Sequence, residues 1–244
     1  MQKKNCRSCR YPKHAAQIPT KRRPLVLNLG ALRSLRKIRE KPLRGKKHLN
    51  VLYLTASPIA NDPLRVDAEV AIVQNEVQRS RFRNRISIFH KPAADLRSLL
   101  DGLNDHKPAI VHFSGHGEET GIAMDNKSVC SPSSQDVPFS LLSQALAATD
   151  IRPKIVVLNS CYSSGAKKAL LKEVDVLIVM KTSISDLAAA NFAAQFYAAV
   201  ASGQSIQASF SQARIAVAAV SLNETRTPEL VAAKGVDPAK IVLT

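Results

Sequence analysis

Two apolar runs in the sequence each end in residues that can do chemistry. The first run ends in VHFSGHG, residues 111–117, and the second in VVLNSCYSSG, residues 156–165. If both runs are neighbouring strands of one parallel sheet, His116 and Cys161 emerge at the same rim, where their side chains can meet. A free thiol is only about a few per cent thiolate at neutral pH, and an adjacent imidazole that removes its proton activates it. The pair therefore predicts a nucleophilic cysteine with a histidine base.

Glycines beside the histidine indicate how a reaction intermediate could be held. Gly115 and Gly117 allow a sharp turn and a close approach of the backbone to a substrate. We expect the backbone amides of Gly117 and Cys161 to bind the oxyanion that forms when a thiolate attacks a carbonyl. Each motif alone also has an ordinary structural interpretation, because cysteines at strand ends are commonly apolar fillers and histidines in turns are commonly hydrogen-bonded. The two motifs together favour catalysis.

The elements that must position these residues alternate along the chain. LNVLYLTA, residues 49–56, is a continuous apolar run typical of a strand buried on both faces, and valines recur every three or four residues in the helix that follows. Such alternation predicts an α/β fold with a mainly parallel six-stranded sheet and helices on both faces. We predict strands at 49–56, 85–89, 109–114, 154–159, 175–180 and 240–243, a helix after Pro63, and helices at 93–103, 138–148, 185–201 and 205–220.

The positive charge of the chain is concentrated at its start. The 244 residues carry a formal charge of +16, and residues 1–48 hold 16 of the 35 Lys and Arg residues against a single acid, Glu40. We therefore divide the chain into a basic, largely flexible arm at 1–48, with a short amphipathic helix at 25–43, and a nearly neutral folded domain at 49–244. Attraction to polyanions should be confined to the arm.

The composition also excludes two targeting signals. No run of about 18 apolar residues occurs, and no apolar segment of signal-peptide type opens the chain, so we expect a cytoplasmic protein with no membrane contact. Four cysteines in that compartment are not expected to form disulfides.

Several interpretations of the arm stay open. Cys6, Cys9 and His14 offer three zinc ligands, one fewer than a closed site needs. The basic run is compatible with a tail that binds a partner, with nonspecific and salt-dependent contact to nucleic acid, with a pro-segment removed at Lys21-Arg22-Arg23, or with a merely solvated tail.

Other polar residues near the motifs have modest signals. His112 lies four residues before His116, a spacing that on a strand separates two potential metal ligands, so we expect a buried or rim histidine instead. Residues 128–136 are polar and predict an exposed loop, in which Cys130 is either filler or a regulatory thiol. Glu118 and Glu119 follow the HG turn and either contact substrate or are simply solvated.

The chain resembles a known family at these motifs. HFSGHG and LNSCYSSG, with LYLTASPIANDPLRVDAEV near the start of the domain and GVDPAKIVL near its end, resemble the CHAT branch of the caspase-like (clan CD) cysteine peptidases, close to bacterial stand-alone members. The resemblance covers residues 49–244 and no part of the arm. It implies a caspase-haemoglobinase fold and peptide-bond hydrolysis, with Cys161 as nucleophile and His116 as general base and acid. It also implies a role in defence against phage, in which a switched-on peptidase cleaves a partner protein.

The resemblance departs from the family pattern where substrate specificity is set. Relatives that cut after Arg or Lys carry an Asp two residues before the nucleophile, and here that residue is Asn159, whose neutral amide cannot pair a buried guanidinium. Asp186 lies where the family builds the other wall of the S1 pocket and could supply the missing charge. The alternative is that Ser185 and Asp186 only cap a helix.

These observations predict a cytoplasmic cysteine endopeptidase that needs no metal or other cofactor in its catalytic step. Its substrate would be a protein, and an upstream sensor or an activating protease would switch it on. The alternative is a catalytically silent adaptor that keeps the fold and recruits a protein or nucleic acid through the basic arm. A third alternative, a zinc-dependent nucleic-acid-binding protein, would depend on the arm alone.

Overall fold

The computed structural model describes residues 48–59, 61–128 and 133–244. The basic arm, with its expected helix and its CxxC pair, lies outside the described residues, and so does Cys130. Among the described helices, none has the length and apolar character that crossing a bilayer would require.

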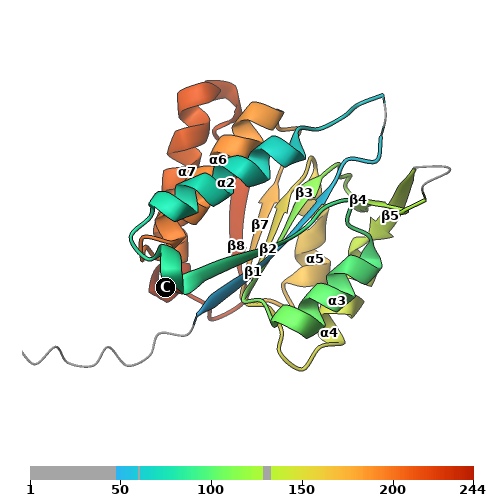
Figure 1. Cartoon of the computed structure of the whole chain (residues 1–244), viewed down its shortest axis with the longest axis horizontal. Coiled ribbons are helices and arrows are strands. Elements are labelled where there is room, and N and C mark those ends of the chain that lie inside the picture. Colours follow the sequence, from blue (N-terminus) through green and yellow to red (C-terminus); the bar gives the residue numbers. More distant parts are fainter. Residues whose placement is uncertain (1–47, 60, 129–132) are drawn as a thin grey trace, which may run out of the picture. The chain divides into compact units, whose positions relative to one another are not determined.

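Six strands form the central sheet, as predicted (Figure 1). Their order is β2-β1-β3-β6-β7-β8, and every neighbouring pair is parallel except β7 and β8. Because the chain passes from β1 to β2 on one side and then returns to β3 on the other, the strand order reverses beside β1. Ligands of parallel sheets bind at such a point, outside the carboxyl ends of the strands. The strands are β1 Leu49–Ala56, β2 Ile86–Lys91, β3 Ile110–Gly115, β6 Ile155–Asn159, β7 Val176–Met180 and β8 Pro228–Ala232.

Helices cover both faces of the sheet (Figure 1). One layer contains α2, α6 and α7, and the opposite layer contains α3, α4 and the short α5. The helices are α2 Val66–Arg79, α3 Leu96–His106, α4 Phe139–Ala147, α5 Lys167–Leu170, α6 Asp186–Val200 and α7 Ile206–Val220. Single 3-10 turns are η2 Arg83–Arg85, η3 Ser163–Ala166, η4 Leu222–Glu224 and η5 Pro238–Lys240.

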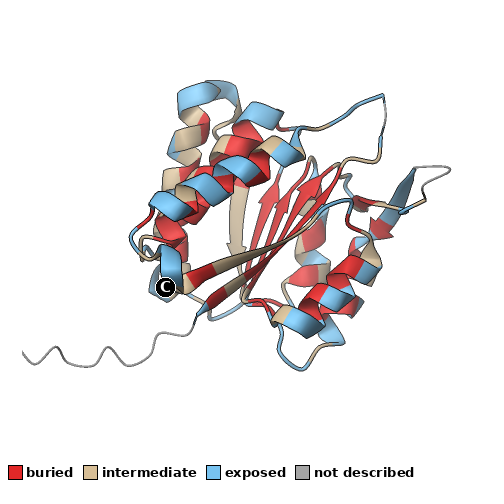
Figure 2. Cartoon of the chain, viewed as in Figure 1, coloured by how far each residue is buried: buried red, intermediate tan, exposed pale blue. Residues whose placement is uncertain are grey.

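Burial on both faces explains why the central strands are largely apolar. In β1, Val51 and Tyr53 pack into the layer of α2, α6 and α7, whereas Leu52 and Leu54 pack into the layer of α3, α4 and α5. Successive side chains of a strand point to opposite faces, so a central strand needs apolar residues at every position. Figure 2 shows the central strands buried along their length between the two helical layers.

The last predicted strand is wrong. Residues 240–243 form no strand: Lys240 ends the 3-10 turn Pro238–Lys240, and residues 241–243 have no regular structure. The sheet ends instead with β8, Pro228–Ala232, antiparallel to β7. The segment KIVL has the apolar character of a strand, but Ile241 and Leu243 pack instead against the core beneath α7. β8 contains the polar Glu229 and lies at the sheet edge, where a continuous apolar run is unnecessary.

Two boundary predictions also need correction. The expected loop at 128–136 is partly a strand, because β5, Ser134–Pro138, pairs with β4, Gly121–Asp125, in a separate antiparallel two-stranded sheet. The helix expected at 93–103 is α3, Leu96–His106; it begins after Asp95, whose carboxylate accepts a hydrogen bond from the Ser98 amide at 2.8 Å.

Candidate active site

His116 and Cys161 follow neighbouring strands at the same level. The β3–β6 register pairs Ser114 with Asn159, and His116 and Cys161 each lie two residues beyond that pair. Both residues line one pocket of about 230 Å³. The remaining wall comes from the segment after β1, the start of α2 and the segment between β7 and α6. The prediction of a shared rim depended on both strands being parallel members of one sheet, and β3 and β6 are such a pair.

Gly117 brings the two motifs into close contact. A Cβ atom at this position would lie 2.8 Å from Ser160 Oγ and 2.9 Å from the Cys161 carbonyl oxygen. Real Cβ atoms do not approach other atoms so closely, so only glycine fits without a shift. The backbone after His116 therefore packs directly on the backbone that carries the nucleophile candidate.

The turn after β6 exposes the Cys161 thiol to the pocket. Tyr162 has a φ of +52°, a left-handed conformation that non-glycine residues adopt infrequently and that is common at functional sites. Ser163 holds the turn from below: its hydroxyl donates to the Leu158 carbonyl at 3.1 Å and accepts from the Met180 amide at 2.9 Å. Cys161 is partly buried, and its sulfur lies 3.6 Å from Ser183 Oγ.

The imidazole of His116 is oriented by the loop after β1. Its Nε2 lies 2.8 Å from the Asp62 carbonyl oxygen. A carbonyl can only accept, so Nε2 carries the hydrogen and Nδ1 keeps the lone pair that a general base needs. The Asp62 carboxylate also lies 3.9 Å from Nδ1. This contribution from Asp62 could not be predicted from the sequence, because it is mainly a contact of the Asp62 backbone with a residue 54 positions away.

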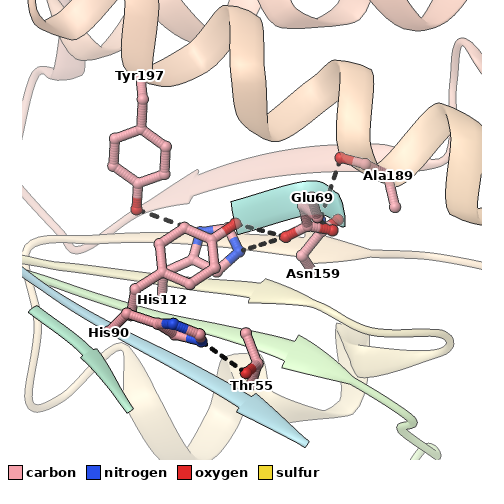
Figure 3. Close-up of polar contacts among 8 residues, drawn as sticks. Thr55, Glu69, His90, His112, Asn159, Ala189 and Tyr197 are labelled. Atoms are coloured by element: carbon pink, nitrogen blue, oxygen red, sulfur yellow. Dashed lines mark hydrogen bonds and ion pairs between the residues drawn. The ribbon is translucent and has the colours of Figure 1, made fainter. Parts of the chain in front are cut away.

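Asn159 and Glu69 form the floor of the pocket. Both line the pocket and are almost fully buried, with 3% and 4% of their surfaces exposed. The Asn159 amide nitrogen donates to Glu69 Oε2 at 3.0 Å and to the Ala189 carbonyl at 3.2 Å (Figure 3). Glu69 also accepts a hydrogen bond from the Tyr53 hydroxyl. The S1 candidate Asn159 is therefore bound to a carboxylate that the sequence analysis did not select.

A signal for Glu69 exists in the sequence. It lies in the first turn of α2, directly before Val70 and on the face that Val73 and Val77 bury. A carboxylate on the apolar face of a helix needs a partner or a function, because burying a lone charge is costly. A charged residue on the otherwise apolar face of a predicted helix is the signal by which Glu69 can be found.

A buried aromatic cluster lies behind the floor (Figure 3). His112 is fully buried, stacks on Tyr53 with the ring centroids 4.0 Å apart, and lies 3.2 Å from the Tyr197 hydroxyl through Nδ1. Burial, opposed by the nearby Glu69, lowers the pKa of His112. Burial and the same carboxylate raise the pKa of Tyr53 and of Tyr197 well above 10. His112 is thus a buried histidine, one of the two placements expected.

Asp186 lies at the start of a helix and also at the pocket. It is the first residue of α6, and Ser185 is the N-cap, its hydroxyl accepting from the Ala188 amide at 3.4 Å. Asp186 also lines the pocket, where its Oδ2 accepts from the Arg65 amide at 3.0 Å. The exposed carboxylate therefore joins the starts of α2 and α6 at the mouth of the pocket.

A second hollow, of about 330 Å³, lies on the other side of His116. Its wall includes Gly117, Glu118, and Ser134 and Asp136 from the β4–β5 sheet. Of the exposed acidic pair after the HG turn, Glu118 faces this hollow, whereas the backbone of Glu119 packs on the turn after Cys161. Within the described ranges, no three His, Cys, Asp or Glu side chains come together as a metal site would require.

Comparisons with known proteins agree with this architecture. A family model described as the CHAT domain matches residues 11–229. The structure is similar to that of the Arg-specific cysteine proteinase gingipain R, at 12% identity and a TM-score of 0.55, with 81% of this chain and 48% of that chain covered. A secreted C11 cysteine protease from Bacteroides thetaiotaomicron, solved with an irreversible peptide inhibitor, is similar at 14% identity and a TM-score of 0.47, covering 69% and 59%. No curated protein matches the chain.

The family match includes all the strands of the central sheet except the end of β8, and it begins within the basic segment. The likeness to gingipain R supports the fold, and this chain spans about half the length of that protein. The chain belongs to the CHAT domain family and has the fold of the caspase-like cysteine peptidases.

Proposed function

We propose that the chain is a cysteine endopeptidase in which Cys161 is the nucleophile and His116 the general base and acid. The observation that carries the proposal is the single pocket lined by both residues, where Gly117 packs on the Cys161 backbone. The orientation of His116 by the Asp62 carbonyl supports it further, because Nδ1 is then free to accept a proton.

The reaction would follow two displacements. His116 Nδ1 takes the Sγ proton, and the thiolate attacks the peptide carbonyl carbon, which gives a tetrahedral oxyanion facing the amides of Gly117 and Cys161. The intermediate collapses as His116 returns the proton to the leaving nitrogen, the C–N bond breaks, and a thioester to Cys161 remains. Water then attacks the thioester, His116 accepts its proton, and the acid product leaves as the thiol is restored.

The hollow beyond His116 would receive the leaving side of the substrate. The residue that protonates the leaving amine must contact the segment after the cleaved bond. His116 lines both hollows, whereas Cys161 lines only the first. The acyl side of the substrate would therefore occupy the pocket with Asn159 and Asp186, as the S1 candidates require.

The biological setting is proposed from the family resemblance. The substrate would be a partner protein in the cytoplasm, and an upstream sensor or activating protease would switch the enzyme on. We further propose a role in bacterial defence against phage, with nonspecific nucleic-acid contact by the basic arm. Plaque counts on bacteria carrying the gene and its neighbours should rise to the unprotected level when Cys161 is replaced by alanine; equal counts would contradict the defensive role.

Cleavage of peptide libraries tests the enzyme directly. The wild-type protein should cleave, and the Cys161→Ala variant should lose at least about 1,000-fold in kcat/KM, the usual scale for loss of a covalent nucleophile. A matched control replaces Cys6, Cys9 and Cys130 by alanine, which leaves Cys161 as the one cysteine of the chain. This control should keep activity and react once with a thiol-directed probe. Equal cleavage by wild type and Cys161→Ala would show that Cys161 is not the nucleophile.

The silent adaptor would give a different result. It predicts no cleavage by the wild-type protein under any activating condition and no preferential labelling of Cys161 by a reactive-cysteine probe. Partner capture that is lost on deletion of residues 1–48 but unaffected by Cys161→Ala would favour the adaptor over the peptidase.

A further inference from the structure

The floor of the pocket carries an oriented carboxylate. Glu69 lies in α2, and its carboxylate accepts hydrogen bonds from Tyr53 and Asn159, so its oxygens are held in place rather than free to turn away (Figure 3). The side chain is 5% exposed and still forms part of the pocket wall. A group that enters the pocket fully would therefore meet Glu69 out of bulk water, where electrostatic attraction is strong.

The pocket has an excess of negative charge. Asp62 and Asp186 line it along with Glu69. Among the described residues its one lining cation is Arg65, which has 72% of its side chain exposed and pairs with Asp67. His112 lies 3.4 Å from Glu69 on the inner side. Because burial lowers the pKa of His112, its ring does not offset the carboxylate at neutral pH. Buried charge without a counter-charge is costly, so the site favours a cationic ligand.

A buried acceptor lies next to the carboxylate. Both partners of the Asn159 amide nitrogen, Glu69 and the Ala189 carbonyl, are acceptors, which fixes the orientation of the amide. Asn159 Oδ1 is then left without a hydrogen-bond donor among the described residues, and Ser160 Oγ is likewise unpartnered there. Buried acceptors of this kind cost about 1–3 kcal/mol each unless a donor reaches them. The floor therefore offers a negative charge beside acceptors, which a cation with several N–H groups would satisfy.

We infer that this pocket binds the side chain of an arginine, with Glu69 as the counter-charge and Asn159 Oδ1 as a second acceptor. Lysine is the weaker alternative, because a guanidinium presents five donors in a fixed plane and can reach both groups at once. A volume of about 230 Å³ suits one side chain rather than a larger ligand. As an S1 assignment, the inference rests on the proposed peptidase function.

The proposed role of the neutral Asn159 thus differs from the one that the family pattern implies for this position. It does not replace an acid before the nucleophile but positions Glu69 and supplies an acceptor of its own. The missing charge comes from Glu69 in α2, the helix after β1. Asp186 is exposed at the mouth of the pocket, where water weakens its attraction for a cation, so it is not the main counter-ion.

Peptides that differ only at P1 test the inference. The wild-type protein should prefer arginine over citrulline, its uncharged isostere, by at least about 30-fold in kcat/KM, the scale for loss of a buried charge partner. Glu69→Gln should reduce cleavage after arginine by a similar factor and leave cleavage after citrulline within about 3-fold. Glu69→Asp should recover part of the preference. Glu76→Gln, an exposed change on the same helix that removes only a pair with Arg79, should change neither.

A binding measurement separates this inference from the proposed function. Titration of the Cys161→Ala protein with benzamidine, a planar cation, should show tighter binding than with neutral benzamide, and adding Glu69→Gln should remove the difference. Glu69-dependent benzamidine binding by a protein that cleaves no peptide would overturn the peptidase and keep the cation site. Cleavage after neutral or acidic residues, with equal rates for arginine and citrulline, would keep the peptidase and overturn the cation site.

The test does not depend on how well the Glu69 variant folds. Thermal unfolding of Glu69→Gln is measured first, since Glu69 has three polar neighbours in the core. If that variant is unfolded, the wild-type ratio of arginine to citrulline and the benzamidine titration of Cys161→Ala decide the question. Equal binding of benzamidine and benzamide would overturn the inference.

Discussion

His112 lies within β3 and is fully buried, whereas His116, just past the end of the same strand, keeps 17% of its side chain exposed. His112 is surrounded by Tyr53, Tyr197 and Glu69, and its pKa is lowered. His116 instead has one nitrogen turned to the Asp62 carbonyl and lines two hollows. The two histidines, four residues apart, thus differ in burial and in contacts. His112 lies between the packed layers, and His116 lies beyond the carboxyl end of β3.

The difference between the two histidines indicates that the site has a rim and a floor with separate roles. The rim, His116 and Cys161, holds the groups proposed for the reaction and adds little to the core. The floor, Glu69 and Asn159, is part of the core together with the His112 cluster behind it, and it offers the groups proposed for recognition. Substitutions at the rim should therefore change rates, and substitutions at the floor should change stability or selectivity.

The largest expected effect comes from the rim. His116→Ala should lower kcat/KM by about 1,000-fold or more, since the thiol then lacks a base, while the free energy of unfolding changes by less than about 0.5 kcal/mol. Peptide cleavage and urea unfolding check the two values. A variant that keeps its rate but loses stability would reverse the roles assigned to the two histidines.

The matching change at His112, behind the floor, should act on stability. His112→Ala removes a fully buried ring that stacks on Tyr53 and should lower the free energy of unfolding by about 3 kcal/mol. Urea denaturation at neutral pH measures it. An unfolding midpoint equal to that of the wild type would show that the cluster behind the floor is not part of the stabilising core.

Gly117→Ala tests the contact between the two motifs. The added Cβ would press on Ser160 Oγ and the Cys161 carbonyl, so kcat/KM should fall about 30-fold as the nucleophile shifts, with a stability loss of about 2 kcal/mol. Gly235→Ala is the control, because Gly235 has a φ of +83° but nothing within 4 Å of the added atom. That control should lose stability through backbone strain and keep its rate; a rate loss in both variants would assign the effect to general destabilisation.

The smallest expected effect is the pH dependence of stability. The pKa of His112 is lowered by burial from its usual 6.5, so below about pH 6.5 the unfolded chain binds a proton that the folded chain does not. Stability should therefore fall as the pH drops through this window, by up to about 1.4 kcal/mol per pH unit for one proton. The half-buried His90, whose pKa burial also lowers, acts in the same direction.

Unfolding curves between pH 7.5 and pH 5 measure this slope. His112→Gln should make the slope shallower by the contribution of one group, and His48→Gln, an exposed change before β1, serves as the reference. An unchanged slope in His112→Gln would show that His112 is not held neutral in the folded protein.

The elements with apolar runs could be predicted because burial on both faces imposes a local pattern. β1, β3, β6 and β7 were found close to their true bounds for this reason. β8 and β5 could not be found, since an edge strand and an exposed two-stranded sheet are stabilised by pairing with distant segments rather than by their own composition. The apolar residues 240–243 were misassigned because packing under a helix and packing in a sheet need similar side chains.

The sequence by itself determined the α/β class and the place of the two motifs at strand ends, because strand periodicity and glycine turns are local properties of the chain. From these it predicted that His116 and Cys161 lie at one rim. Only the tertiary structure decided which residues surround them: the Asp62 carbonyl on the histidine, Glu69 beneath Asn159, and Asp186 at the mouth of the pocket. Those contacts join segments between 54 and 121 residues apart, and no local pattern records which distant segments will pack together.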